Sequence, residues 1–168
     1  MALTDAEARA RAEATVRAYC GWHVAPEKDE TLTLDGSGNG ALLLPSLHVV
    51  DVVSITENGT LLDPTDYAWS QAGMVRRFPA TWRVDAQGRW TGNLRAVVVE
   101  VVHGFTDWPL DVLAVIDRLV VRATAGVGVL SQVGAVAYAT GQDGVPLSDS
   151  LSTADRDALA PYLLPFRP

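Results

Sequence analysis

The sequence is poor in cysteine and in long apolar runs, and each shortage excludes a class of protein. Its 168 residues include one cysteine, Cys20, so an internal disulfide is impossible. No apolar run approaches the roughly 20 residues that span a bilayer. The N-terminus has no basic region followed by an apolar core, as a secretory signal would. We therefore expect a protein that is made in the cytoplasm and has no membrane partner.

The chain also has few cations, and almost all of them are arginine. It carries 13 Lys and Arg against 20 Asp and Glu, a formal net charge of -7, and Lys28 is its one lysine. Affinity for nucleic acid comes largely from cations that displace counterions from phosphates. We therefore expect no specific binding of DNA. A negatively charged channel wall could still surround a duplex and let it slide.

Motifs for catalysis and metal binding are missing as well. The sequence has no Gly-x-Ser-x-Gly elbow, phosphate-binding loop or dinucleotide fingerprint. Cys20 and His23 are close enough to share a metal, but a zinc site needs about four ligands and there is no second cysteine. We predict no catalytic residue, no metal site and no cofactor. His103 and Asp107, at the end of a predicted strand, leave a minor enzymatic alternative open.

Helix signals at two places, with strand signals between them, predict an α+β fold. Thr4 and Glu7 have the spacing of a capping box, and Gly21 follows where a C-terminal cap is expected, so one helix is predicted at about 4–20. A second helix, at about 109–125, has proline in its first turn. Its predicted apolar face consists of Leu110, Leu113, Ile116, Val120 and Val121.

Between these helices, residues 29–104 are predicted to form a β-rich insertion. Asn58-Gly59 lies between two apolar runs, and this dipeptide is the strongest short-range hairpin signal because both residues accept positive φ. The run 95–103 is largely apolar on both faces. We therefore predict that this run is a central strand of the sheet.

The end of the chain has weaker signals. The glycine-rich stretch up to Gly144 has no clear period. Ser152 and Asp155 predict the cap of a short helix that continues through Leu163. We therefore divide the chain into a core of residues 1–126 and a flexible segment with a C-terminal tail, residues 127–168.

Five short segments follow one another in a recognisable order: Tyr19–His23, Leu42–Pro45, Val49–Val53, Asp63–Tyr67 and His103–Phe105. Taken together, they resemble the head-to-tail adaptor (connector) proteins of long-tailed bacteriophages. The resemblance covers roughly residues 5–125 and fits the predicted order of helix, β insertion and helix. Some members of that family carry such an insertion between the helices of a small bundle.

This resemblance implies a structural protein of the virion and no enzymatic activity. Adaptors of this family bind below the portal ring, in the neck between head and tail, and form a ring themselves, typically twelve-fold. The ring extends the channel through which DNA passes without specific recognition, and it docks a stopper or tail-completion protein. A location in the virion neck, after synthesis in the host cytoplasm, is therefore expected.

The resemblance also implies a role for the C-terminal tail. In this family the C-terminal segment often reaches onto the portal protein. If that property transfers, Tyr162, Leu163 and Phe166 are the apolar anchors of a portal-docking tail.

One local patch of the sequence is both basic and aromatic. Arginine and tryptophan commonly anchor protein interfaces, so Arg76, Arg77, Trp82 and Trp90 are predicted interface residues. A nucleic-acid surface and a solvated sheet edge remain alternatives. A carbohydrate- or peptide-binding β module, with Trp69, Trp82 and Trp90 along a cleft, is the alternative from another class. A stopper or tail-completion protein is the nearest alternative within phages.

Overall fold

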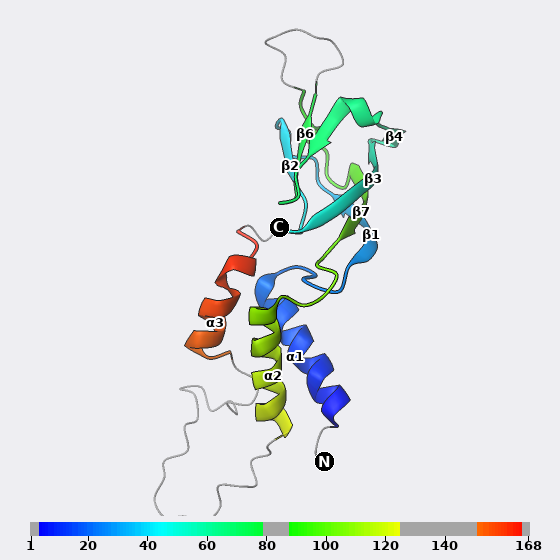
Figure 1. The fold of residues 1–168 in the computed structure, drawn as a ribbon. Helices are drawn as coiled ribbons and strands as arrows, with labels where there is room; N and C mark the ends of the chain where they lie inside the picture. The colour runs from blue at the N-terminus through cyan, green and yellow to red at the C-terminus, as the bar shows by residue number, and fades with distance from the viewer. Residues whose placement is uncertain (1–3, 79–87, 125–150, 166–168) are drawn as a thin grey trace, which may run out of the picture. The chain divides into compact units, whose positions relative to one another are not determined.

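The computed structural model describes residues 4–78, 88–124 and 151–165, and it combines helices with antiparallel sheets (Figure 1). The predicted α+β class is confirmed. The chain divides into two compact units. The helical unit takes Met1–Gly21 and Trp108–Leu163, and the β unit takes Trp22–Asp107 with the short segment Leu164–Pro168.

Helix α1, Asp5–Cys20, begins and ends where the sequence predicts. The Thr4 hydroxyl accepts a hydrogen bond from the Glu7 amide, and the Glu7 carboxylate accepts one from the Thr4 amide at 2.9 Å. Gly21 closes the helix with a φ of 82°, a left-handed conformation that glycine adopts at little cost. The buried side chains of α1 are small and lie on one face: Ala8, Ala12, Val16 and Cys20.

Helix α2, Leu110–Thr124, packs beside α1, and its buried face differs from the predicted one. The buried residues are Val112, Val115, Ile116 and Leu119. The prediction was right for Ile116, but Leu110 is 85% exposed and Val121 is 64% exposed. Leu110 lies in the first turn of α2 and Val121 near its last turn, and the buried stripe is formed by residues between them.

A short helix, α3 (Thr153–Leu159), continues into a 3-10 turn, η3 (Ala160–Tyr162), and packs against α2. Ser152 caps α3 as predicted, because its hydroxyl accepts from the Asp155 amide and its own amide donates to the Asp155 carboxylate. The contacts of this segment place it in the helical unit. Within the residues that the structure describes, no helix has the length and apolar content needed to cross a bilayer.

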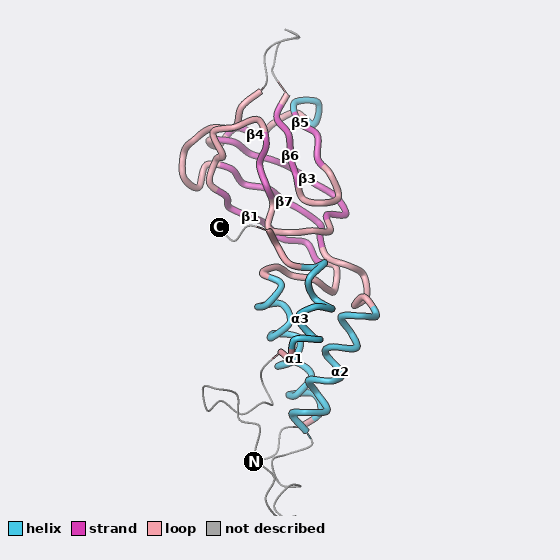
Figure 2. Tube along the Cα trace, turned by 90° about the vertical axis from the view of Figure 1, so that its left-hand side faces the viewer, coloured by secondary structure: helices cyan, strands magenta, loops and turns pink. Residues whose placement is uncertain are grey.

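The described part of the β unit forms two antiparallel sheets (Figure 2). Their strands are β1 (Lys28–Leu34), β2 (Ala41–Leu43), β3 (Val49–Glu57), β4 (Thr60–Leu61), β5 (Tyr67–Trp69), β6 (Met74–Arg77) and β7 (Val97–His103), with a 3-10 turn, η1 (Pro64–Asp66), before β5. Sheet A has the order β1-β7-β3-β4, and sheet B has the order β2-β6-β5. The predicted central position of β7 is therefore confirmed.

The predicted Asn58-Gly59 hairpin joins β3 to β4. Asn58 has a φ of 48° and Gly59 a φ of 80°, both positive, as a type I′ turn requires. Glu57 and Thr60 face each other across this turn in the register of the two strands. The dipeptide therefore fixes the local pairing, and the hairpin prediction is confirmed.

One apolar cluster holds both sheets together. Val99 of β7, Ile55 of β3 and Val75 of β6 belong to it, and none of the three has measurable exposure. Successive residues of a strand point to opposite faces, so the neighbours of these residues point outward. Because the inward side chains of both sheets meet in one cluster, the outward faces of sheets A and B lie on opposite sides of the β unit.

Two register shifts interrupt the pairing of β3 with β7. One lies between Val49 and Asp51 and the other between Val52 and Ser54. A bulge adds one residue to a strand and redirects its side chain. The added residue of the second shift, Val53, is 59% exposed. The added residue of the first shift, Val50, is 42% exposed. Strand β3 thus exposes two valines beside its polar residues.

Candidate functional site

The outward face of sheet A is acidic. Asp29 of β1 and Asp51 of β3 both oppose Val102 of β7, and Glu100 lies two residues earlier on the same side of β7. All three carboxylates are on exposed residues. We call this surface the acidic face, and its exposed members are Asp29, Thr31, Thr33, Asp51, Val53, Leu61 and Glu100.

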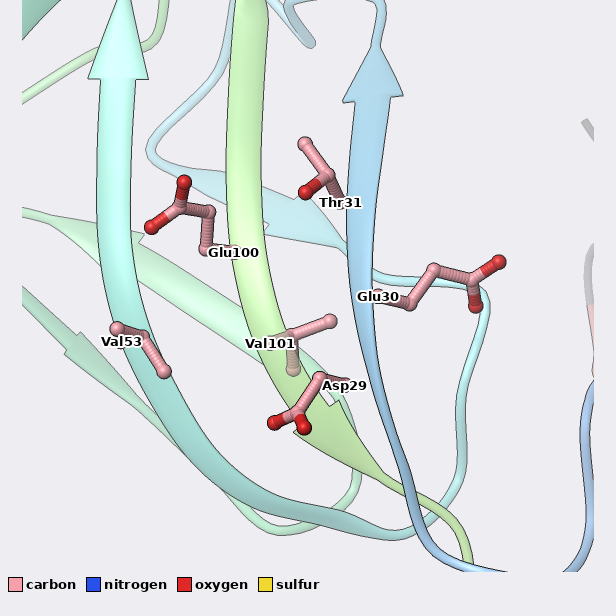
Figure 3. Close-up of a pocket in the computed structure, with 6 residues that line it drawn as sticks. All are labelled: Asp29, Glu30, Thr31, Val53, Glu100 and Val101. Atoms are coloured by element: carbon pink, nitrogen blue, oxygen red, sulfur yellow. The ribbon is translucent and has the colours of Figure 1, made fainter.

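The acidic face contains an open depression, which Figure 3 shows in close-up. Asp29 and Thr31 extend to one side of β1 there, while Glu30 extends to the other. The Glu100 carboxylate accepts a hydrogen bond of 2.8 Å from the Ser54 hydroxyl, which orients it on the sheet surface. A surface of carboxylates and hydroxyls attracts a cationic partner and repels phosphate groups.

The outward face of sheet B is apolar apart from one arginine. Leu43 of β2 and Met74 of β6 oppose each other directly and are 52% and 42% exposed. Arg76 lies in the next outward row, and Phe78, two residues further along on the same side, is 45% exposed. We call this surface the apolar face, and its members are Ala41, Leu43, Ala68, Met74, Arg76 and Phe78.

Arg76 and Arg77 are neighbours in the sequence but have opposite environments. The Arg77 guanidinium lies 3.4 Å from the Glu57 carboxylate, 3.6 Å from that of Asp66 and 5.8 Å from the centre of the Trp90 ring. Arg76 is exposed, and no carboxylate within the described residues pairs with it. Arg77 therefore stabilises the β unit, whereas Arg76 can pair with a carboxylate of another molecule.

The structure corrects one of the four predicted interface residues. Trp90 is 2% exposed, and its indole nitrogen donates to the Val75 carbonyl at 3.4 Å, so its side chain belongs to the core and cannot reach another chain. Arg77 is half-buried among partners of its own chain. Trp82 lies outside the described residues. Arg76 keeps the exposed position that an interface residue needs.

Sequence reasoning missed the apolar residues beside Arg76. Met74, Arg76 and Phe78 alternate with Val75 and Arg77, which is the period of a strand. The signal was therefore present in the sequence. Its interpretation depends on knowing that Val75 points into the core, and the pairing of β6 with its neighbours supplies that information.

In the helical unit, a set of ion pairs that we call the clasp fastens α3 to α2. Asp155 of α3 is 1% exposed, and it accepts from the Arg118 guanidinium at 2.9 Å and from that of Arg122 at 2.5 Å. Burial by itself would raise the pKa of Asp155, but hydrogen bonds from Arg122, Ser152 and Arg118 outweigh it and hold this pKa well below its usual range. The clasp thus keeps a buried carboxylate charged.

The first of the predicted portal-docking residues is engaged within the helical unit. The Tyr162 hydroxyl donates to the Asp111 carboxylate at 3.0 Å, and burial together with this hydrogen bond raises the pKa of Tyr162 to about 12. Tyr162 and Leu163 are half-buried. Phe166 lies outside the described residues. Docking through Tyr162 would therefore use the ring, since its hydroxyl already has a partner.

The histidine and cysteine side chains have structural environments. His103 is 1% exposed, and its Nε2 lies 2.8 Å from the carboxylate of Glu30, which also pairs with Lys28 at 2.9 Å. Burial raises the pKa of the Cys20 thiol to about 11, so the thiol stays protonated and is a poor nucleophile at neutral pH. Across residues 4–78, 88–124 and 151–165, no group of three or more His, Cys, Asp or Glu side chains is placed to hold a metal ion.

Comparison by sequence finds no protein family and no curated protein that matches the chain. Comparison by structure finds similar chains in gene transfer agent particles. A chain in the neck of the native particle, computed with C12 symmetry, aligns with a TM-score of 0.53 and 16% identity over 96% of this chain and 84% of that chain. A chain in the neck of the empty particle, computed with C6 symmetry, aligns with a TM-score of 0.50 and 16% identity over 96% of this chain and 80% of that chain.

A third chain, from the virion of the native particle, aligns with a TM-score of 0.45 and 18% identity over 86% of this chain and 76% of that chain. At 16% identity, the likeness of the two neck chains to this chain establishes a shared fold. The alignment covers 96% of this chain in both cases, so the shared fold includes helical and β segments alike.

Proposed function

We propose that this chain is a structural subunit of a virion neck, an adaptor that forms a ring below the portal. The observation that carries the proposal is the shared fold, because two chains from necks of gene transfer agent particles align with 96% of this chain. Those necks were computed with C12 and C6 symmetry, which favours a ring, and a twelve-fold ring in particular.

The order of the elements supports the adaptor over other neck components. Helix α1 and helices α2 and α3 come from the two ends of the chain and form one unit, while the β unit is inserted between α1 and α2. This is the arrangement that the sequence resemblance implies. A stopper or tail-completion protein is the nearest alternative among the other proteins of a phage neck.

The charge of the chain suits a channel through which DNA passes. A formal net charge of -7 gives no general attraction to phosphates, so a ring of such subunits would extend the portal channel without binding the duplex. The next neck component, a stopper or tail-completion protein, would dock on the side of the ring away from the portal. In this role the chain assembles and needs no catalytic group.

For the portal contact, we propose the end of the helical unit and the residues that follow it. Tyr162 and Leu163 are half-buried there, and Phe166 follows three residues later. The clasp and the bond from Tyr162 to Asp111 hold this end against α2. A segment that is already positioned loses less conformational entropy when it docks.

Co-sedimentation with the cognate portal ring tests this proposal. The wild-type chain should migrate with the portal. Leu163→Asp should weaken the interaction at least about tenfold, since a charge in an apolar contact has a high desolvation cost. Leu94→Asp, at a loop residue that is 79% exposed, is the matched control and should still bind. A wild-type chain that never migrates with the portal contradicts the adaptor role, and equal weakening by both variants excludes docking through Leu163.

The described tryptophans do not favour the binding-module alternative. That alternative needs Trp69, Trp82 and Trp90 along one exposed cleft, but Trp69 is exposed while Trp90 is 2% exposed in the core, and Trp82 lies outside the described residues. The binding module would be favoured over the adaptor if the wild-type protein stays monomeric, does not bind the portal ring and binds an oligosaccharide or a peptide.

A further inference from the structure

The acidic face and the apolar face lie on opposite sides of the β unit, and their chemistry is complementary. We propose that these two faces are the subunit contact of the assembled protein, with the apolar face of one copy packed against the acidic face of the next. The ring itself rests on the proposed function, whereas the faces that meet are inferred from the β unit alone.

Exposed apolar side chains give the contact its first component. Leu43, Met74 and Phe78 on the apolar face are 52%, 42% and 45% exposed. On the acidic face, Val53 is 59% exposed and Leu61 is 67% exposed. Leu43 and Met74 oppose each other directly on the apolar face, and burying exposed apolar side chains of this size at an interface is favourable.

Charge gives the second component. Among the named members of the apolar face, Arg76 is the one cation. The acidic face presents the carboxylates of Asp29, Asp51 and Glu100. The guanidinium can donate two parallel hydrogen bonds to one carboxylate, which fixes the orientation of the pair as well as balancing its charge. Apolar neighbours around Arg76 strengthen such a pair, because they exclude water from it.

The same charges disfavour a symmetric contact between like faces. Two acidic faces would bring three carboxylates of each copy together, and two apolar faces would bring one Arg76 close to the other. Like charges across an interface are repelled, so the pairing of unlike faces is preferred. A contact between opposite sides of a subunit is heterologous, and repeated heterologous contacts close into a ring when the rotation between copies permits.

Cysteine cross-linking tests which faces meet. Met74→Cys labels the apolar face and Val53→Cys labels the acidic face, while the native Cys20 is buried and its thiol pKa is about 11, so it reacts poorly. A short bis-maleimide should link a mixture of the two variants into dimers, and it should link the double variant into a ladder. Each variant alone, and the loop variant Leu94→Cys as control, should give no dimer.

The linker is applied to the free protein at high concentration and to the portal-bound protein. Dimers from either variant alone would overturn the proposal, because they would mean that like faces meet. A portal-bound ring without cross-links would overturn it as well, while leaving the adaptor role intact. Cross-linked ladders without any portal binding would instead contradict the adaptor role and support this contact.

A charge swap tests the role of Arg76. Arg76→Glu and Glu100→Arg should each reduce the cross-linked yield about tenfold, as expected when one partner of an interfacial charge pair is reversed. The two changes in one chain restore complementarity between neighbouring copies and should recover most of the yield. A double variant as weak as the single ones would exclude pairing between Arg76 and Glu100.

Discussion

The helical unit and the β unit are stabilised in different ways. In the β unit, one apolar cluster drawn from both sheets includes fully buried residues such as Ile55 and Val99. In the helical unit, α1 contributes mainly small side chains, and α3 is held by Asp155 between two arginines. Apolar burial does not titrate, whereas paired charges do. Both units also contain buried apolar side chains, but among the described elements only α3 is held by a carboxylate that is 1% exposed, so the docking of α3 should be more sensitive to loss of charge than the β unit is.

The largest effect is expected from a cavity in the β unit. Ile55→Ala should lower the free energy of unfolding by about 2–5 kcal/mol, because a side chain without measurable exposure is truncated among close-packed neighbours. Urea unfolding followed by tryptophan fluorescence measures the change, since Trp90 is buried in the same cluster. Leu94→Ala, at a residue that is 79% exposed, should stay within about 0.5 kcal/mol of wild type. Equal losses for the two variants would contradict the assigned core.

The clasp should give the next largest effect, confined to the helical unit. Asp155→Ala should destabilise the docking of α3 by about 2–3 kcal/mol, less than for a fully buried pair because the Arg118 side chain is 49% exposed. Hydrogen exchange of the α3 amides measures this loss. Asp157→Ala, at an exposed carboxylate of the same helix, is the control and should change little. Faster exchange in the β unit as well would mean that the units are not independent.

The clasp should also make the helical unit sensitive to acid. Asp155 has a lowered pKa in the folded chain, so its contribution is complete above its unfolded pKa of about 3.9 and is lost as the pH falls toward the folded value. Protection of α3 should therefore decline from about pH 4 downward. Asp155→Asn removes the titrating group and should flatten this dependence. The same slope in wild type and variant would show that another group is responsible.

The smallest effect is expected at the end of the helical unit. Tyr162→Phe removes the hydrogen bond to Asp111 and should cost about 0.5–1.5 kcal/mol of helical-unit stability. A double-mutant cycle with Asp111→Asn isolates the pair, because the combined loss should be smaller than the sum of the single losses. Strictly additive losses would mean that the two side chains do not interact in solution.

Local signals in the sequence predicted the ends and turns of the fold well. The cap at Thr4, the left-handed Gly21 and the Asn58-Gly59 turn depend on residues that lie a few positions apart, and all three are found in the structure. The central position of β7 was predictable because valines make up most of both of its faces. These features need no knowledge of the rest of the molecule.

Features that depend on distant partners could not be predicted. Trp90 is buried because it packs with Val75 and Arg77, which lie more than ten positions earlier in the chain. Asp155 is separated from Arg122 by 33 positions, so no spacing rule pairs them. The composition of the two outward faces of the β unit likewise depends on which strands pair with one another. The sequence pattern predicts strands but does not determine their pairing.

The most direct test of the adaptor role is the native mass of the protein, measured alone and after mixing with its cognate portal ring. If the chain is an adaptor, the portal should gain one copy of the 17.9 kDa chain for each portal subunit, because a symmetric template offers one equivalent site per subunit. A portal mass that does not change would contradict the proposed adaptor role.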